Sequence, residues 1–142
     1  MSFDIALING DMKIQSDGSI KTYSDTSKLR QDIIKILLTG LSTNKVYPWY
    51  GCNMANDFIA KNIPDNVVFS EINDSVIESI NNLVKLQQHQ SGFQELSLAE
   101  GIYKILNVSA SRDISDPRQV NISVSILTKR LTKIEEVFTV IS

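Results

Sequence analysis

The sequence predicts an α+β fold in which two main amphipathic helices pack on one face of an antiparallel sheet. Three observations lead to this prediction: short strand and turn signals near the N-terminus, helical spacing of apolar residues through the middle, and a change to a period of two in the last third. No linker, repeat or low-complexity segment interrupts the 142 residues. Because that length suffices for one hydrophobic core but not two, we expect residues 1–142 to form a single domain.

The N-terminal segment has turn signals between short apolar pieces. Residues 3–8 form an apolar run that stops at Asn-Gly-Asp (9–11), and two further extended pieces flank Ser-Asp-Gly (16–18). Asn-Gly and Asp-Gly pairs are typical of tight turns between antiparallel strands. We therefore predict a small hairpin near the N-terminus.

The first long helix is expected to begin near Ser24 or Asp25, since both residue types favour the N-cap position. One apolar face follows at helical spacing: Leu29, Ile33, Ile36 and Leu37. Ile34 and Leu38 widen this face, which predicts burial of the helix on more than one side. Gly40 lies just past the end, where we expect it to form a left-handed C-cap.

A short helix is predicted for residues 54–61, ending before Pro64. The second long helix should begin near Asp65 or Ser70 and end near Gln90. Its predicted buried face is Phe69, Ile72, Val76, Ile80 and Leu83, and its predicted polar face is Glu71, Asp74, Glu78 and Asn81.

The last third predicts three antiparallel strands in a meander. Apolar residues alternate with Asn and Ser in two runs: Leu106, Val108 and Ala110, then Val120, Ile122, Val124 and Ile126. Asp116-Pro117 marks a turn between these runs, and residues 134–141 form the last strand.

The composition argues against several classes of function. The net charge is −2 and no basic surface stands out, so we expect no nucleic-acid partner. The chain has no apolar run near the ~18 residues of a membrane span and no signal peptide, so we expect no membrane association and a cytosol-like compartment. Cys52 and His89 are the only residues of their kinds, which predicts no disulfide, no metal site and no cofactor.

Catalytic motifs are also missing, and we expect no enzymatic activity and no small-molecule substrate. A glycosidase needs two carboxyl groups ~5–10 Å apart, one of them in an apolar pocket. Glu71 and Glu78 are seven residues apart on the long helix, but they lie on its polar face, where a solvated surface explains them better.

One short turn concentrates aromatic residues. Tyr47, Trp49 and Tyr50 lie within four positions, together with Pro48 and Gly51. The rings could fold inward and fix the two helices against the sheet, or they could contact a partner, since aromatic residues dominate protein–protein interfaces. Both alternatives remain open at this point.

The predicted sheet offers a second kind of candidate site. The strand at 120–127 has an uncharged outward face, and the last strand ends flush with the chain. If either lies at a sheet edge, another chain could add a strand to it; the alternative is a central position. The candidate contact residues of the last strand are Ile134, Val137, Phe138 and Val140.

The order of these features resembles a known family. A helix ending in Leu-Leu-Thr-Gly (37–40), the turn Tyr-Pro-Trp-Tyr-Gly-Cys (47–52), a short helix, a long helix and a β-meander follow one another. This order, and above all the Pro-x-Tyr-Gly turn after a Leu-Thr helix end, is similar to baseplate assembly protein W of contractile-tailed phages, a wedge family sometimes labelled lysozyme-like. The resemblance covers nearly the whole chain.

The resemblance implies a structural protein of the virion tail baseplate, assembled in the host cytoplasm. It implies that an arm of the tail sheath protein adds a strand to the sheet, so that the protein templates the first sheath ring. Six copies per baseplate, one per wedge, and contacts with other baseplate wedge proteins are also implied.

Two departures from the family pattern leave alternatives open. Many members of the family have Gly-Glu-Arg before the aromatic turn, where this sequence has residues 41–45 instead. Many also have Glu-Pro-Arg after the long helix. The nearest counterpart in this sequence is Asp116-Pro117-Arg118, which lies between two predicted strands. A plain β-turn explains that tripeptide as well as a docking role does. A glycan-cleaving tail enzyme, or a strand-binding adaptor absent from the particle, are the alternative functions.

Overall fold

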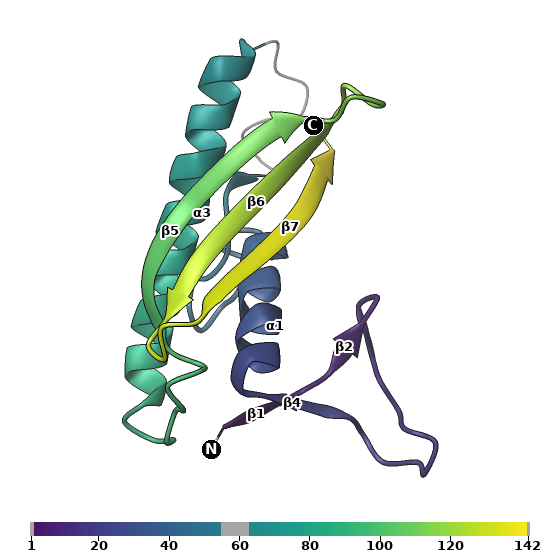
Figure 1. The fold of residues 1–142 in the computed structure, drawn as a ribbon, viewed down its shortest axis with the longest axis vertical. Coiled ribbons are helices and arrows are strands. Elements are labelled where there is room, and N and C mark those ends of the chain that lie inside the picture. The colour runs from purple at the N-terminus through teal and green to yellow at the C-terminus, as the bar shows by residue number, and fades with distance from the viewer. Residues whose placement is uncertain (1, 55–62, 142) are drawn as a thin grey trace.

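The computed structural model describes residues 2–54 and 63–141. It confirms the α+β prediction, because two long helices lie on one face of an antiparallel three-stranded sheet (Figure 1). The helices and the sheet strands are α1 (Asp25–Leu38), α3 (Asp65–Gln90), β5 (Ile102–Arg112), β6 (Gln119–Thr128) and β7 (Lys133–Ile141). The short helix predicted at 54–61 falls, apart from Met54, outside the described residues.

Both long helices form where their apolar spacing predicts. α1 follows Ser24 as its N-cap, and α3 begins directly after Pro64. One buried cluster joins the two helices to the sheet, and it is the source of most of the hydrophobic stabilisation. Its fully buried members include Leu29, Ile33 and Ile36 of α1, Ile72, Val76 and Ile80 of α3, and Ile122, Val124 and Ile126 of β6.

The C-cap prediction for Gly40 is wrong. α1 ends at Thr39, which has an extended backbone, and Gly40 forms a parallel bridge with Cys52. The Cys52 N–H donates to the Thr39 carbonyl oxygen at 2.8 Å. A tertiary hydrogen bond therefore satisfies the carbonyl of the C-cap residue, and the extended chain continues into the bridge with Cys52.

The sheet order is β5-β6-β7, which places the segment 120–127 in a central strand rather than at an edge. β7 pairs with β6 along nine residues without a shift, from Gln119↔Ile141 to Leu127↔Lys133. The β5–β6 ladder has two register shifts, one of them between Ile105 and Asn107.

The second shift separates Leu106 from Val108 and Ala110, with which the sequence alternation grouped it. Leu106 is the extra residue of a bulge and is 42% exposed, whereas Val108 and Ala110 beyond it pack against the buried cluster. A bulge adds one residue to one strand, so the inward and outward positions exchange on one side of it.

The N-terminal residues form more than the single hairpin predicted. β1 (Phe3–Ile5) pairs with β4 (Thr22–Ser24), and β2 (Leu7–Ile8) pairs with β3 (Asp11–Met12). Asn9 and Gly10 both have positive φ, as the two-residue turn of such a hairpin requires. We call residues 3–24 the N-terminal ribbon; part of it extends away from the two packed layers (Figure 1).

Candidate functional site

The outer edge of β7 exposes backbone hydrogen-bonding groups. The Thr128 N–H donates to the Thr132 carbonyl at 3.0 Å, so these opposite residues form a hydrogen-bonded pair. Hydrogen-bonded and non-bonded pairs alternate along an antiparallel ladder. With the observed register, Val137 and Thr139 belong to non-bonded pairs, and their N–H and C=O groups point away from β6. Among the described residues, no strand pairs with this edge.

Charge is confined to the first half of β7. The Lys133 Nζ lies 3.2 Å from the Glu135 carboxylate, and hydrogen bonds from Lys133 and Ser125 hold the pKa of Glu135 below its usual range. From Val137 to Val140 the strand carries no charge. Since charged residues protect natural sheet edges from unwanted pairing, the second half of β7 is the part open to strand addition.

The predicted contact residues of β7 occupy both faces of the sheet. Ile134 is fully buried, and Phe138 and Val140 pack against the core, so their side chains hold β7 to the helices. Val137 is 68% exposed on the opposite face. Only Val137 of this set therefore offers its side chain to a partner.

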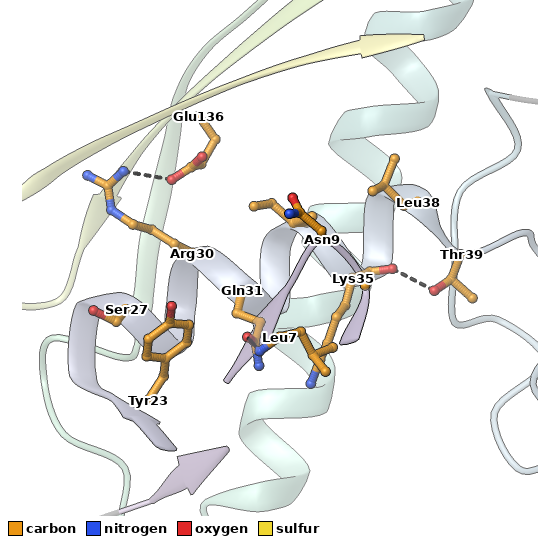
Figure 2. A pocket seen from close by; sticks show the side chains of 12 residues that line it. Leu7, Asn9, Tyr23, Ser27, Arg30, Gln31, Lys35, Leu38, Thr39 and Glu136 are labelled. Carbon is orange, nitrogen blue, oxygen red and sulfur yellow. Dashed lines mark hydrogen bonds and ion pairs between the residues drawn. The ribbon is translucent and has the colours of Figure 1, made fainter. Parts of the chain in front are cut away.

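Beside β7, a groove with a volume of about 790 Å³ runs along α1 (Figure 2). We call it the α1 groove. Its floor is one face of α1, its walls are β7 and the N-terminal ribbon, and its lining is mostly apolar. The floor residues are Ser27, Arg30, Gln31, Ile34, Lys35, Leu38 and Thr39, and the walls contribute Glu136 from β7 and Leu7, Asn9, Gly10 and Tyr23 from the ribbon.

The groove corrects the prediction that Ile34 and Leu38 are buried by the protein's own fold. Ile34 is 38% exposed and Leu38 is 63% exposed. The buried face of α1 meets α3 and the sheet, but nothing in the described part of the chain covers this second apolar stripe. The widened apolar face of α1 is the sequence signal for the groove, although apolar spacing alone predicts that this face is buried in the core.

Polar contacts hold both walls of the groove to α1. On the β7 side, the Arg30 guanidinium donates to the Glu136 carboxylate at 2.7 Å (Figure 2). On the ribbon side, Gln31 accepts a hydrogen bond from the Leu7 N–H at 2.8 Å and donates to the Ile5 carbonyl at 2.8 Å. The groove is therefore built by side chains of one helix that bind β7 on one side and both strand pairs of the N-terminal ribbon on the other.

An ion pair between Lys35 and Asp4 strengthens the ribbon wall. Burial pushes the pKa of Asp4 upward, but hydrogen bonds from Lys35 and Gln31 outweigh it and hold that pKa below the usual value of 3.8. A carboxyl group with a lowered folded-state pKa stabilises the fold above its unfolded-state pKa. That contribution is lost as the pH falls through the folded-state value.

Replacing Asp4 with Asn should therefore cost stability near neutral pH and little in acid. We expect Asp4→Asn to lower the free energy of unfolding by about 0.5–1 kcal/mol at pH 7, because the pair is partly exposed and screened by solvent. The difference should shrink below pH ~4, where the parent carboxylate becomes protonated. Urea unfolding of both proteins from pH 2.5 to 7 measures it; a difference independent of pH would contradict the ion-pair explanation.

The aromatic turn uses its rings in two ways. Tyr50 packs against the core, and burial, aided by the negative charges of Asp32 and Asp4, raises its pKa to about 12. Tyr47 and Trp49 lie at the surface with ring centroids 5.3 Å apart, and Tyr47 is 40% exposed. In this turn Tyr50 therefore packs inward, whereas Tyr47 is exposed and Trp49 beside it is half-buried. Contact of the Tyr47–Trp49 pair with a partner stays a prediction.

Gly51 fixes the turn against the end of α1. Its φ of +125° is a conformation that residues with a Cβ rarely adopt, and a Cβ there would lie 2.8 Å from the carbonyl oxygens of Thr39 and Gly40. The Ser79 hydroxyl of α3 donates to the Gly51 carbonyl at 2.8 Å. Gly51 thereby lets one backbone segment contact both helices.

The turn predicted at Asp116-Pro117 is confirmed between β5 and β6. The Asp113 carboxylate caps this turn by accepting hydrogen bonds from Ser115. These bonds, together with those from Asn121 and the backbone, lower the pKa of Asp113 to about 2. Arg118 Nε lies 3.3 Å from the Asp116 carboxylate within the same turn. A docking role for Asp116, Pro117 and Arg118 stays a prediction.

Sequence reasoning missed a buried carboxyl group, Glu100. It lies between α3 and β5 and is 1% exposed. The Ser2 hydroxyl donates to one of its oxygens and the Ser97 N–H to the other, at 2.7 Å for the latter. The side-chain amide of Gln87 in α3 donates to the backbone carbonyl of Glu100 at 2.7 Å. The same connection contains Glu95, which is exposed, so the sequence pattern did not single out Glu100 as the buried carboxyl group.

The carboxylates considered for catalysis do not converge on a cavity of this site. Glu71 and Glu78 are exposed on α3, opposite its buried face, and neither lines the α1 groove. Within residues 2–54 and 63–141, no group of three or more His, Cys, Asp or Glu side chains could hold a metal ion. No helix in this part of the chain is long and apolar enough to cross a membrane.

Comparison with known proteins gives a likeness in fold to a solved structure. No protein-family model and no curated protein sequence matches the chain. A crystal structure of a "putative tail lysozyme" from Geobacter sulfurreducens is similar in fold, with a TM-score of 0.60 and 16% sequence identity over 80% of this chain and 87% of that one. At this identity the likeness supports the two-layer α+β fold.

Proposed function

We propose that the protein is a structural, non-enzymatic component of a contractile phage tail baseplate that starts the tail sheath. In this proposal the outer edge of β7 accepts a strand from a sheath subunit. Six copies, one in each wedge, would present six such edges as a ring in the virion tail. The Tyr47–Trp49 pair and the Asp116–Arg118 turn would contact neighbouring wedge proteins.

The β7 edge is the observation that carries the proposal. β7 is regularly paired on its β6 side, and the backbone groups of Val137 and Thr139 point outward in an uncharged stretch. An added strand would gain main-chain hydrogen bonds in a geometry that the rigid sheet already holds. The likeness in fold to the putative tail lysozyme, and the resemblance to the baseplate W family, support the placement in a tail.

The mechanism is templating. A sheath polymer needs a first ring, and an unassisted ring must order several subunits before their contacts stabilise one another. Subunits bound to six preformed edges would already have the correct spacing and orientation, which removes most of that entropy cost.

Polymerisation of the sheath protein encoded in the same genome tests the proposal. A substoichiometric amount of the protein should shorten the lag in light scattering and give tubes of uniform diameter by negative-stain microscopy. A lag that does not change over a range of added protein would contradict templating. Mass spectrometry of purified particles would separate a baseplate component from an adaptor, which would be missing from them.

The glycan-cleaving alternative has its own test. We expect no loss of turbidity when the protein is added to purified bacterial cell walls, because Glu71 and Glu78 lie on an open, solvated helix face. The variants Glu71→Gln and Glu78→Gln should behave like the parent, with hen egg lysozyme as the positive control. Lysis by the parent that either variant abolishes would establish the enzyme instead.

A further inference from the structure

The α1 groove suggests what kind of strand β7 accepts. In a two-layer fold, every strand of the sheet needs an apolar surface beneath the face it turns toward the helices. α1 and the N-terminal ribbon lie on the side of β7 that faces away from β6 (Figure 1), and Glu136 of β7 forms one wall of the groove. A fourth strand at the free edge of β7 would therefore lie over this groove.

We propose that the α1 groove binds the inward-facing side chains of the added strand and thereby selects its sequence. This inference rests on the proposed function. The occupant is an amphipathic extended segment of a partner chain, with large apolar residues at alternate positions toward α1 and polar residues on the outer face. Ile34, Leu38 and Leu7 form the apolar floor and wall that these side chains contact.

The dimensions of the groove match an extended segment. Within α1, the floor of the groove extends from Ser27 to Leu38. These residues are eleven positions apart in the sequence, which corresponds to about 17 Å along the helix. A strand covers that length with about five residues, of which two or three face the groove. A helix could fill the apolar space, but it would leave the outward N–H and C=O groups of Val137 and Thr139 unpaired.

Two of the polar side chains in the groove are already paired within the protein. Gln31 binds the ribbon backbone and Arg30 binds Glu136, so these side chains maintain the walls. The apolar surface that remains exposed in the groove is formed by Ile34, Leu7 and the more exposed Leu38. The groove therefore discriminates by size and hydrophobicity of the alternate side chains, more than by charge.

Peptide binding tests this inference. Overlapping fluorescent peptides of about twelve residues, covering the sheath protein of the same genome, would be titrated with the full-length protein by anisotropy. The best peptide should contain alternating large apolar residues, and replacing these with Ser should abolish binding. In the protein, the double variant Ile34→Gln/Leu38→Gln should bind that peptide about tenfold or more weakly, because the apolar contact area is lost.

Two controls separate this inference from the proposed function. Leu98→Gln makes the same change at a leucine that is also 63% exposed but lies outside the groove, and it should bind like the parent. Val137→Pro blocks the β7 edge without altering the groove. If Val137→Pro abolishes binding and the double Gln variant does not weaken it, strand addition holds and the groove inference is overturned.

The reverse pattern is equally decisive. Binding that needs Ile34 and Leu38 but survives Val137→Pro would mean that the occupant is not an added strand, for example a helix, and would overturn the inference. If no sheath peptide binds the groove while the protein still shortens the sheath lag, the inference fails and the proposed function stands.

Discussion

Replacing Val137 with proline should abolish most of the sheath-starting activity while leaving the fold intact. Proline removes the outward N–H of Val137, and its ring occupies the position from which an incoming carbonyl would accept that hydrogen bond. A carbonyl left unpaired in a buried interface costs about 1–3 kcal/mol, which corresponds to roughly a 5- to 150-fold loss of affinity per site. Because a ring would contain six such sites, the losses of affinity would combine, and sheath nucleation would be reduced more than binding at a single site.

The fold should tolerate this change because the affected group does not serve the β6–β7 ladder. Proline is accepted on edge strands when its missing N–H faces solvent, and the Val137 side chain is mostly exposed. Urea unfolding should therefore show a loss of no more than about 1 kcal/mol. The measurement is the lag time of sheath polymerisation by light scattering, at equal concentrations of parent and variant.

Two matched variants make the result specific. Val137→Thr keeps the N–H and a β-branched side chain, so it should start the sheath as the parent does. Phe138→Pro removes an N–H that points toward β6, and it should destabilise the protein itself. A Val137→Pro protein that is folded and as active as the parent would show that the β7 edge is not the contact.

Replacing Gly51 with alanine should produce the largest loss of stability of any single methyl addition considered. The backbone of Gly51 has a φ of +125°, and the added Cβ would overlap two carbonyl oxygens at 2.8 Å. Strained backbone costs of order 1–3 kcal/mol, and a forced shift of packed atoms adds a similar amount. We expect the free energy of unfolding to fall by about 2–5 kcal/mol, measured by chemical denaturation.

Gly18→Ala is the matched control. Gly18 also has a positive φ, +83°, but nothing lies within 4 Å of a Cβ built there. It should cost only the conformational penalty of about 1–2 kcal/mol. Equal losses at Gly18 and Gly51 would mean that the close approach of the aromatic turn to the end of α1 is not what constrains Gly51.

Local patterns predicted the helices and most of the sheet. The 3.6-residue spacing of α3 and the alternation of β6 each depend on residues that are neighbours in the chain, and both elements lie where that spacing places them. The Pro117 turn and the Asn9-Gly10 turn could also be predicted from the sequence, because a few residue types favour those backbone conformations.

Three features could not be read from local pattern. The bulge at Leu106 depends on how β5 fits β6, so a regular alternation did not show which face that residue occupies. The end of α1 depends on Cys52, twelve residues beyond Gly40, through a backbone hydrogen bond to Thr39. The α1 groove depends on which apolar stripe of α1 the rest of the chain covers, and spacing alone does not distinguish a stripe that meets the core from one that remains exposed.

The sequence by itself determined which segments are helices and strands and which residues can form a core, because periodicity and turn chemistry act over a few residues. Only the tertiary structure decided that β6 is central and β7 is an edge, that Tyr50 is packed while Tyr47 and Trp49 meet solvent, and that Ile34 and Leu38 line a groove. These outcomes depend on contacts between segments far apart in the chain, and it is those contacts that leave one strand edge and one helix face unpartnered.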